Sequence, residues 1–405
     1  MQEKAKEPEI RFAGFTGAWE QRKLGALLDE YKVSIPTPHD GYTRLGIRSH
    51  AKGTFHEYVP KGRELETKEM NKVAKDKLIL NITFAWEHAV AITDEKDEGA
   101  LVSHRFPQFT LHPEIIPNFL KYVILDESFR HHLYLASPGG AGRNRVLKIS
   151  QMLEYAIKYP STAEQLRISN LLDSINSLIT LHQRKYEKLL NIKKSMLEKM
   201  FPKEGEVVPE IRFKGFTGAW EQRSLGEICV PVQRNDPYSH APVMMITASS
   251  GFIYQSVRYS FDNSGQSLQK YTLLKKGELA YNHGASKLRP FGSCFALNVK
   301  EARIPFVYHS FAVNDDDPEF VSLELNGTNV EKQLRKLVSS GARMDGLLNI
   351  SFDDYGTVTL PLPSIDEQKK ISSFFLKLDS LLTLHQRKLE MLKNVKQAFL
   401  EKMFV

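Results

Sequence analysis

The sequence contains only two cysteines, Cys229 and Cys294, among 405 residues. Two cysteines are too few for a disulfide framework or a zinc ligand set, and they fit a reducing compartment. The first ten residues, MQEKAKEPEI, hold no apolar core, and the sequence contains no run of about 18 apolar residues. We therefore expect a cytoplasmic protein with no secretory signal and no membrane span.

Catalytic motifs are also scarce. The sequence contains no G-x-S-x-G, no H-E-x-x-H and no paired C-x-x-C, and the glycine cluster at 139–142 is not followed by Lys-Ser or Lys-Thr. One short nuclease-like pattern exists, Asp40 followed by Glu66-Thr67-Lys68, which would supply a Mg²⁺ ligand set and a base. We expect no catalytic residue and no metal site. A stand-alone Mg²⁺-dependent nuclease or methyltransferase, or a structural coiled-coil adaptor, remain the alternatives.

What the sequence does contain is a long internal repeat. Residues 8–25 and 209–226, which we call the PEIRF segments, share 16 of 18 positions at an offset of 201. Residues 174–201 and 377–404 share 17 of 28 positions at an offset of 203. The blocks between them, about 26–160 and 227–363, are otherwise dissimilar. This pattern indicates duplication of a whole domain followed by a helix.

The repeated C-terminal stretches predict two long helices. Each follows a proline and begins with a capping-box pattern, Ser161 to Glu164 and Ser364 to Glu367. No Pro or Gly interrupts 164–201 or 367–405, so each helix can extend for roughly 55 Å. We expect the two helices to pair antiparallel, with the variable blocks at opposite ends of the pair.

The apolar residues of these helices follow a heptad, which is typical of a coiled coil with a broad face. The residues that widen this face at position e are Leu172, Ile179, Tyr186, Phe375, Leu382 and Leu389. Position a holds Ile168, Ile175, His182, Leu189 and Met196 in the first copy, and Ile371, Leu378, His385, Leu392 and Phe399 in the second. Position d holds Leu171, Leu178, Lys185, Ile192 and Lys199, then Phe374, Leu381, Lys388, Val395 and Lys402. Because polar groups in a seam fix register, we assign His182, Lys185, His385 and Lys388 to the register of the helix pair.

The variable blocks read as mixed strand and helix. Buried strands are expected within 75–93 and 275–297, where Leu78 aligns with Leu279 and Asn81 with Asn282. The segments 104–111 and 309–315 are later counterparts, and 137–150 and 339–351 are small-residue loops that carry arginine. Two domains that share a scaffold but differ in their loops typically use those loops to bind different ligands.

A formal charge of +7 and a pI near 9.0 lean mildly towards a polyanionic partner. Arginine can grip guanine or phosphate with a forked pair of donors. Our candidate DNA-binding residues lie in or beside the loops of the variable blocks: Arg143, Arg145, Lys148, His104, Arg105, Arg343, Asn349, Lys287, Arg289 and His309. The aromatic residues of the PEIRF segments are expected to pack or to contact a partner subunit: Phe12, Phe15, Trp19, Phe213, Phe216 and Trp220.

The sequence resembles the specificity subunit of type I restriction–modification systems. The resemblance rests on four duplicated features taken together: the PEIRF segment, the helix starts at 161–165 and 364–368, and the motifs TLHQRK and EKMF. The resemblance covers essentially the whole chain. It implies an α+β fold with a pseudo-twofold internal repeat, in which two α/β target-recognition domains are separated by two long antiparallel coiled-coil helices. The implied boundaries are 1–160 for the first domain, 161–201 for the first helix, 202–363 for the second domain and 364–405 for the second helix.

The same resemblance implies a non-catalytic chain of a bacterial or archaeal cell that reads a bipartite, asymmetric double-stranded DNA site. Its expected partners are DNA, two modification subunits that methylate adenine N6 with S-adenosylmethionine, and two restriction subunits that use ATP and Mg²⁺. The complex would act as a site-specific deoxyribonuclease and methyltransferase. No cofactor is expected on this chain. The base pairs read, the spacer between the half-sites and the base-contacting residues do not follow from the resemblance.

Overall fold

The computed structural model describes residues 7–139, 145–258, 265–338 and 348–405. The chain forms two compact units, Met1–Gln183 with Arg387–Val405 (unit 1) and Arg184–Gln386 (unit 2). Each unit therefore holds one variable block together with one end of each long helix. The division between the units falls inside the helices.

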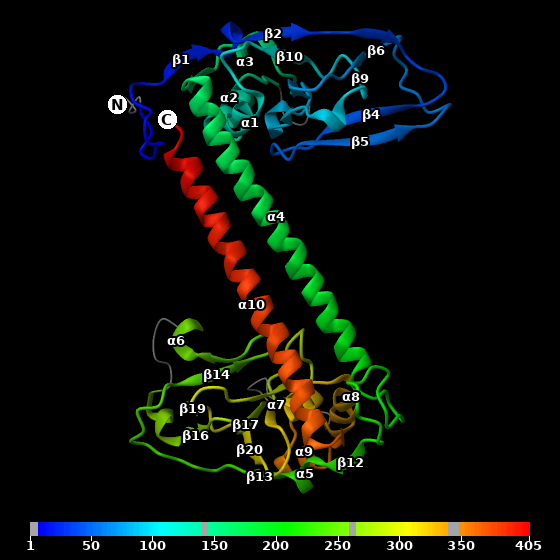
Figure 1. Ribbon diagram of the computed structural model, residues 1–405, viewed down its shortest axis with the longest axis vertical. Helices are drawn as coiled ribbons and strands as arrows, with labels where there is room; N and C mark the ends of the chain where they lie inside the picture. Colours follow the sequence, from blue (N-terminus) through cyan, green and yellow to red (C-terminus); the bar gives the residue numbers. More distant parts are fainter. Residues whose placement is uncertain (1–6, 140–144, 259–264, 339–347) are drawn as a thin grey trace. The chain divides into compact units, whose positions relative to one another are not determined.

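Unit 1 is mainly β-structure in its first part and helical after residue 116 (Figure 1). Its strands are β1 (Glu20–Lys23), β2 (Leu28–Tyr31), β3 (Ser34–Pro36), β4 (Tyr42–Ile47), β5 (Thr54–Val59), β6 (Glu69–Lys72), β7 (Lys77–Leu80), β8 (Val90–Ile92), β9 (Leu101–Val102), β10 (Gln108–Leu111) and β11 (Ala156–Tyr159). Its short helices are α1 (Pro117–Val123), α2 (Glu127–Leu135) and α3 (Ile149–Met152).

Unit 2 repeats this succession (Figure 1). Its strands are β12 (Glu221–Ser224), β13 (Cys229–Pro231), β14 (Met244–Thr247), β15 (Gly251–Tyr254), β16 (Thr272–Lys275), β17 (Leu279–Asn282), β18 (Ser293–Ala296), β19 (Glu301–Ile304), β20 (His309–Val313) and β21 (Thr359–Leu362). Its short helices are α5 (Leu225–Ile228), α6 (Gln255–Arg258), α7 (Pro318–Leu325), α8 (Thr328–Leu337) and α9 (Phe352–Gly356).

The central sheet of both units has the same antiparallel order, β2-β10-β7-β8 in unit 1 and β13-β20-β17-β18 in unit 2. Leu78 pairs with Phe109 in unit 1, and Leu279 pairs with Phe311 in unit 2. The predicted alignment of these two blocks is thus confirmed. Both blocks hold buried strands as expected, although a 3₁₀ turn at Ala85–Glu87 separates β7 from β8.

The remaining strands differ more between the units. Unit 1 has a five-stranded sheet, β3-β6-β9-β4-β5, whereas unit 2 has the two-stranded pairs β14-β15 and β16-β19 in the part of the chain that the structure describes. A further pair closes each unit, β1 with β11 and β12 with β21. This last pair joins each PEIRF segment to the strand that leads into a long helix.

The two long helices are α4 (Thr162–Lys199) and α10 (Ile365–Lys402). In unit 1 the start of α4 shares a core with the end of α10, where Ile168 and Leu172 are buried beside Met403. In unit 2 the end of α4 shares a core with the start of α10, including Met200 and Ile371. The helices are therefore antiparallel.

The buried face of these helices differs from the predicted seam. Residues at a and e are buried, namely Ile168, Leu172 and Ile175 in unit 1 and Ile371, Phe375, Leu378 and Leu382 in unit 2. At d, Leu178 and Leu381 are 44% and 42% exposed. The placement of Leu178 and Leu381 in the seam was therefore wrong, whereas the predicted widening of the apolar face at e is confirmed for Leu172, Phe375 and Leu382. The e positions are buried because the helices also pack against the domain cores.

Candidate nucleic-acid and partner interfaces

Each PEIRF segment is joined to a long helix by a buried ion pair. Arg11 donates from Nε and Nη2 to the two carboxylate oxygens of Glu164, at 2.8 and 2.9 Å. Arg212 does the same to Glu367, at 2.7 and 2.6 Å. Both arginines also donate to a carbonyl six residues later in the chain. The glutamates that the sequence assigned to capping boxes therefore hold the PEIRF segments in place.

The glutamine after each of these glutamates completes the junction. The side chain of Gln165 accepts from the Ile116 N–H at 2.9 Å and donates to the Pro160 carbonyl at 2.8 Å. Gln368 accepts from the Asp317 N–H at 2.9 Å and donates to the Pro363 carbonyl at 3.0 Å. Glu-Gln is thus repeated because it fixes the helix start, the PEIRF segment and the domain to one another.

The aromatic residues of the PEIRF segments lie mostly inside. Trp19 and Trp220 are 5% and 2% exposed and pack edge-on against Phe119 and Phe320. Phe12 and Phe213 pack against the same cores. Phe15 and Phe216 are half-buried, each beneath a helix cation, Arg167 at 5.8 Å and Lys370 at 4.8 Å.

In unit 1, four loops meet at one edge of the central sheet. We call residues 48–53, 81–88, 103–106 and 145–148 the unit 1 loop cluster. Backbone hydrogen bonds tie these loops together: His50 N–H to the Glu87 carbonyl at 2.8 Å, Ile82 N–H to the Arg105 carbonyl at 3.0 Å, and Leu147 N–H to the Ile82 carbonyl at 2.8 Å. The loops are therefore a fixed surface built on the ends of β4, β7 and β10.

This surface carries a concentration of cations and exposed rings. The predicted residues His104, Arg105 and Lys148 are exposed in it. Arg145 lies 4.1 Å above the Tyr134 ring and donates from Nη2 to its hydroxyl at 2.9 Å. Arg143 lies outside the described residues. Side chains of this kind at fixed positions suit contacts with phosphates and base edges.

Sequence reasoning missed part of this surface. Arg48, His50 and Lys52 are exposed beside the predicted residues, and Phe84 is 43% exposed. The stretch RSHAKG directly after a strand was the available signal. His50 and Ala51 adopt positive φ, 61° and 49°, and the backbone of both is held by hydrogen bonds to the loop between β7 and β8.

The equivalent surface of unit 2, residues 248–250, 283–292, 305–308 and 348–351, is the unit 2 loop cluster. Leu348 N–H donates to the His283 carbonyl at 2.9 Å, which repeats the Leu147–Ile82 bond of unit 1. Lys287 and Asn349 are exposed in it. Leu288 and Phe306 are 63% and 52% exposed, and Ser249 and Ser250 are exposed. Arg343 lies outside the described residues.

Two of the predicted DNA-binding residues of unit 2 turn inward. Arg289 is half-buried and donates to the Asn326 carbonyl, and its Nε is buried without a hydrogen-bond partner among the residues that the structure describes. Burial lowers the pKa of Arg289. His309 is half-buried, lies 2.9 Å from the Ile350 carbonyl and contacts the rings of Tyr281, Phe352 and Tyr355. Both residues thus make contacts inside unit 2, and their assignment to the DNA surface stays a prediction.

His309 should make the stability of unit 2 decrease in acid. Burial lowers the pKa of His309 below its ordinary value, so the unfolded state, whose histidine pKa is about 6.5, binds the proton more tightly. The stabilisation is complete above about pH 6.5 and is lost as the pH falls below it. His309→Gln keeps a hydrogen-bond donor for the Ile350 carbonyl. In this variant the thermal unfolding midpoint of unit 2 should fall less steeply with decreasing pH than in the original protein. His104→Gln is the control, and an equally steep fall in His309→Gln would contradict the assignment.

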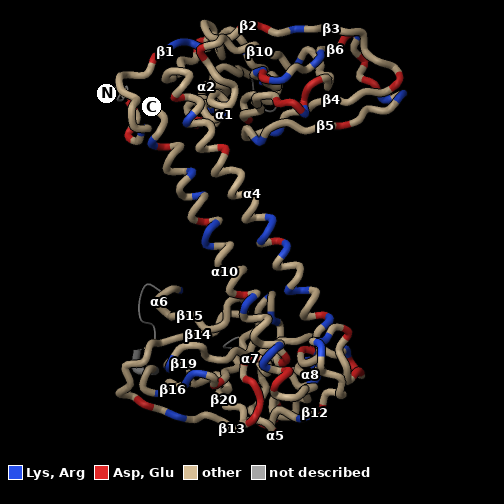
Figure 2. Tube along the Cα trace, in the orientation of Figure 1, with Lys and Arg blue, Asp and Glu red and all other residues tan. Residues whose placement is uncertain are grey.

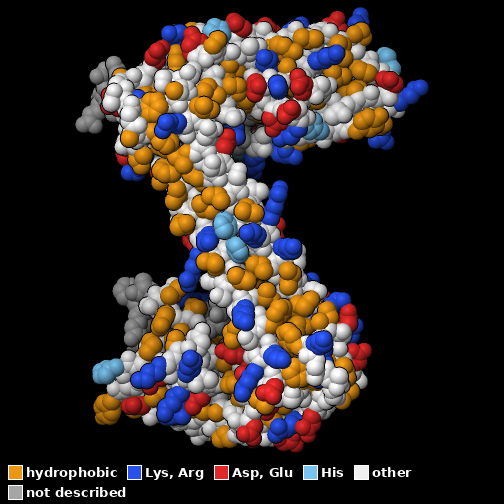
Figure 3. Space-filling model, viewed as in Figure 1, with side chains coloured by type: hydrophobic (Ala, Val, Ile, Leu, Met, Phe, Trp, Pro, Cys, Tyr) orange, Lys and Arg blue, Asp and Glu red, His pale blue; other side chains and the backbone are white. Residues whose placement is uncertain are grey.

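The long helices present exposed apolar side chains as well as cations. Hydrophobic side chains gather over α4 and α10 on the face in Figure 3, and Lys and Arg recur along both helices in Figure 2. The exposed apolar residues are Leu166, Leu178, Leu181, Met391 and Val395 in unit 1 and Leu190, Leu197, Leu376, Leu381 and Leu384 in unit 2. His182 and His385 are half-buried, whereas Lys185 and Lys388 are exposed and lie outside the buried face.

The residues of the short nuclease-like pattern lie at the surface. Asp40, Glu66 and Lys68 are exposed. Within residues 7–139, 145–258, 265–338 and 348–405, no group of three or more His, Cys, Asp or Glu is arranged to hold a metal ion. Cys229 and Cys294 are buried free thiols whose pKa is raised by burial. Over the same described part of the chain, no helix is long and apolar enough to cross a bilayer.

No family model matches the sequence, and neither does any of the curated proteins compared with it. Solved structures do match. The S subunit of a type I restriction–modification system from M. genitalium aligns over 98% of this chain and 99% of its own, with 15% identity and a TM-score of 0.51.

Two further matches have lower scores. The HsdS subunit from Thermoanaerobacter tengcongensis has 17% identity, covers 95% and 96% of the two chains and has a TM-score of 0.45. A chain from a structure of type I R-M complex assembly has 16% identity, covers 95% and 97% and has a TM-score of 0.43. Taken with the two repeated units and their antiparallel helices, the M. genitalium match shows that this chain has the fold of a type I restriction–modification S subunit.

Proposed function

We propose that this chain is the DNA sequence-specificity subunit of a type I restriction–modification complex. Each unit reads one half of a bipartite double-stranded DNA site. The observation that carries the proposal is that both units have the same central sheet and the same junction to the helices, while the two loop clusters differ in side chains. The shared fold with a solved S subunit supports the same role.

The difference between the loop clusters supports an asymmetric site. The unit 1 loop cluster exposes Arg48, Lys52, Arg105 and Lys148, whereas the unit 2 loop cluster exposes serines, Lys287 and apolar side chains. Forked and ammonium donors favour guanine edges and phosphates, and apolar side chains favour the thymine methyl group. Two surfaces of different chemistry read two different half-sites.

The partners supply the chemistry in this proposal. Two modification subunits bind S-adenosylmethionine and methylate adenine N6, and two restriction subunits use ATP and Mg²⁺ for translocation and cleavage. The chain itself is non-catalytic. The surfaces for these subunits are the half-buried aromatic residues Phe15 and Phe216 of the PEIRF segments and the exposed leucines near the middle of α4 and α10, namely Leu178, Leu181, Leu190, Leu381 and Leu384. A net charge of +7 supports DNA binding that depends on the assembled complex.

Exchange of residues 26–160 for the corresponding block of a chain with different specificity tests the proposal. Methylated sites would be sequenced in cells that carry the exchanged subunit with its modification subunits. We expect one half of the methylated motif to change and the other half to stay, because unit 2 is untouched. A motif that changes in both halves, or in neither, would overturn the assignment. As a control, the pure chain given Mg²⁺ or S-adenosylmethionine should neither cleave nor methylate DNA, with Glu66→Ala behaving identically.

A further inference from the structure

Unit 2 contains a cavity of about 860 Å³ between α7, α8 and the adjoining ends of α4 and α10. Its apolar wall includes Leu197, Phe201, Leu323, Phe375 and Leu376. The volume is in the range of small-molecule and cofactor sites, which combine apolar walls with a few polar groups. All of the lining residues belong to unit 2.

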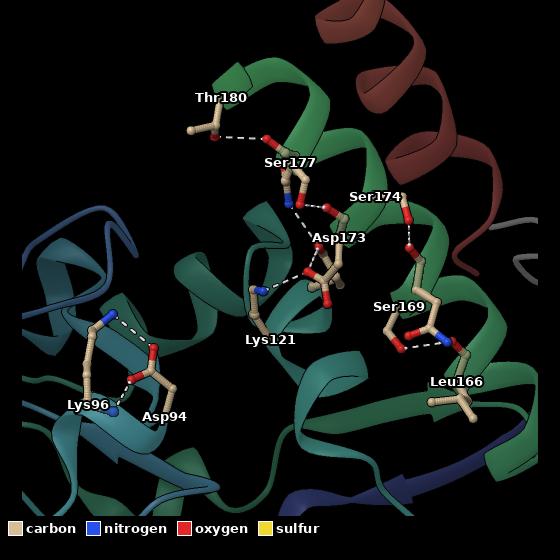
Figure 4. A network of polar contacts seen from close by, with 12 residues as sticks. Asp94, Lys96, Lys121, Leu166, Ser169, Asp173, Ser174, Ser177 and Thr180 are labelled. Carbon is tan, nitrogen blue, oxygen red and sulfur yellow. Dashed lines mark hydrogen bonds and ion pairs between the residues drawn. The ribbon is translucent and has the colours of Figure 1, made fainter. Parts of the chain in front are cut away.

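The equivalent place in unit 1 holds a network of polar side chains. Lys121 Nζ lies 2.8 Å from Asp173 Oδ1 (Figure 4). The Tyr122 hydroxyl donates to the same oxygen at 2.5 Å, and Asn176 donates to the Tyr122 hydroxyl at 2.9 Å. At the repeat offsets, Ser322, Leu323 and Leu376 of unit 2 stand in place of Lys121, Tyr122 and Asp173. The cavity thus arises where three large or polar side chains of unit 1 are replaced by smaller or apolar ones.

Three carboxyl side chains line this cavity that have no counterpart in unit 1. Glu319, Glu324 and Asp379 occupy the positions at which unit 1 has Asn118, Val123 and Asn176. Asp379 pairs with Lys193 at 2.5 Å. Burial, together with the neighbouring carboxyl groups of Asp317 and Asp379, raises the pKa of Glu319 to about 7.

Glu324 is the more unusual of the two. It is 3% exposed, and its Oε1 has no hydrogen-bond partner among the described residues. Burial raises its pKa well above the ordinary value. An unsatisfied buried polar group costs about 1–3 kcal/mol, and the valine of unit 1 avoids that cost at the same place. A ligand that pairs with this carboxyl would explain its presence.

The cations near the cavity are largely occupied. Lys193 pairs with Asp379, and Lys332 pairs with Glu204 at 2.7 Å. Arg289 donates to the Asn326 carbonyl and has Glu331 beside it, which raises its pKa against the effect of burial. Lys194 and Glu198 of α4 also line the cavity, and both are exposed. The inner groups left to pair with a ligand are therefore Glu319 and Glu324.

We propose that this cavity binds an organic cation with an apolar body, such as an alkylammonium. Glu324 and Glu319 pair with the cationic group, and Leu197, Phe201 and Phe375 pack against the apolar body. The site is independent of DNA reading and goes beyond the proposed function.

Calorimetric titration of the full chain, without DNA, tests the site with hexylammonium as the probe and with hexanol and hexanoate as comparisons. We expect saturable binding of hexylammonium, with hexanol and hexanoate weaker by about tenfold or more. A cation stabilises the ionised carboxyls, so binding should release protons, measured as a dependence of the enthalpy on the buffer. Absence of hexylammonium binding, or tighter binding of hexanoate through Arg289, would overturn the proposal.

The residues of unit 1 provide matched variants. Glu324→Val should weaken hexylammonium binding by about tenfold or more and raise the thermal midpoint of the free protein. Leu323→Tyr with Leu376→Asp should fill the cavity and abolish binding, which keeps the test decisive if the first variant folds poorly. Tyr122→Leu in unit 1, which opens space without introducing a carboxyl, should leave binding unchanged. Unaltered affinity in both unit 2 variants would contradict the site.

Discussion

Replacing Arg212 with leucine should destabilise unit 2 by about 3–5 kcal/mol, the range observed when one partner of a buried ion pair is removed. Glu367 is 0% exposed and receives two hydrogen bonds from Arg212. Without the guanidinium its carboxylate must be buried uncompensated or take up a proton. The junction of PEIRF segment, helix start and domain would loosen together.

The measurement is urea unfolding followed by Trp220 fluorescence in a Trp19→Phe, Trp86→Phe background. This background removes the other two of the three tryptophans, so that the signal reports unit 2. Arg212→Leu with Glu367→Leu should recover much of the loss, because two apolar side chains leave no buried charge. Arg11→Leu is the matched variant in unit 1 and should leave the Trp220 transition near its original midpoint. A change below about 1 kcal/mol in Arg212→Leu would show that the pair behaves like a surface ion pair.

Arg105→Ala and Arg145→Ala should each weaken specific DNA binding by the assembled complex by about 5–150-fold. This corresponds to about 1–3 kcal/mol for one base-reading arginine. Both residues lie in the unit 1 loop cluster, and Arg145 is held against Tyr134 before DNA arrives. Binding would be measured on target duplexes mutated in one half-site at a time. The variants should tolerate base changes in the half-site that unit 1 reads and remain selective for the half-site that unit 2 reads.

Lys23→Ser is the control for these variants. Lys23 is an exposed cation of unit 1 paired with Glu154, and the second PEIRF segment has Ser224 at the same place. The Lys23→Ser variant should leave the DNA affinity and the sequence selectivity of the assembled complex unchanged. If Lys23→Ser weakened binding as much as Arg105→Ala, the arginines would be acting through net charge alone. A uniform loss over all sequences with a shallower salt dependence would assign them to phosphates.

The repeat, the two long helices and the paired central strands were predictable, because each leaves a periodic or duplicated pattern in the sequence. Arg11 and Glu164 were not predicted as partners, since they are 153 residues apart and the local sequence offered a capping box for the glutamate. The inward contacts of His309 and Arg289 were not predicted for a related reason. A polar residue beside a loop can face either way, and only the packing of Tyr281 and Asn326 decides it.

The Unit 1 loop cluster could be predicted only in part. The loops at 103–106 and 145–148 were predicted because each carries an arginine. The loop at 48–53 joins them through backbone hydrogen bonds to residues 87 and 88, and such contacts leave no mark in the order of residues. The cavity of unit 2 could not be predicted, because its walls come from α4, α7, α8 and α10, which are far apart in the sequence.

The division of the chain also governs the order in which it folds on the ribosome. Unit 2 is one continuous stretch, Arg184–Gln386, whereas unit 1 needs Arg387–Val405. Phe404 stacks on Phe119 at 5.5 Å, and the Ile10 N–H donates to the Lys402 carbonyl at 2.9 Å. Domains commonly fold in the order of synthesis. Here the part made first is completed last, so the N-terminal core stays open until the final turn of α10 has left the exit tunnel.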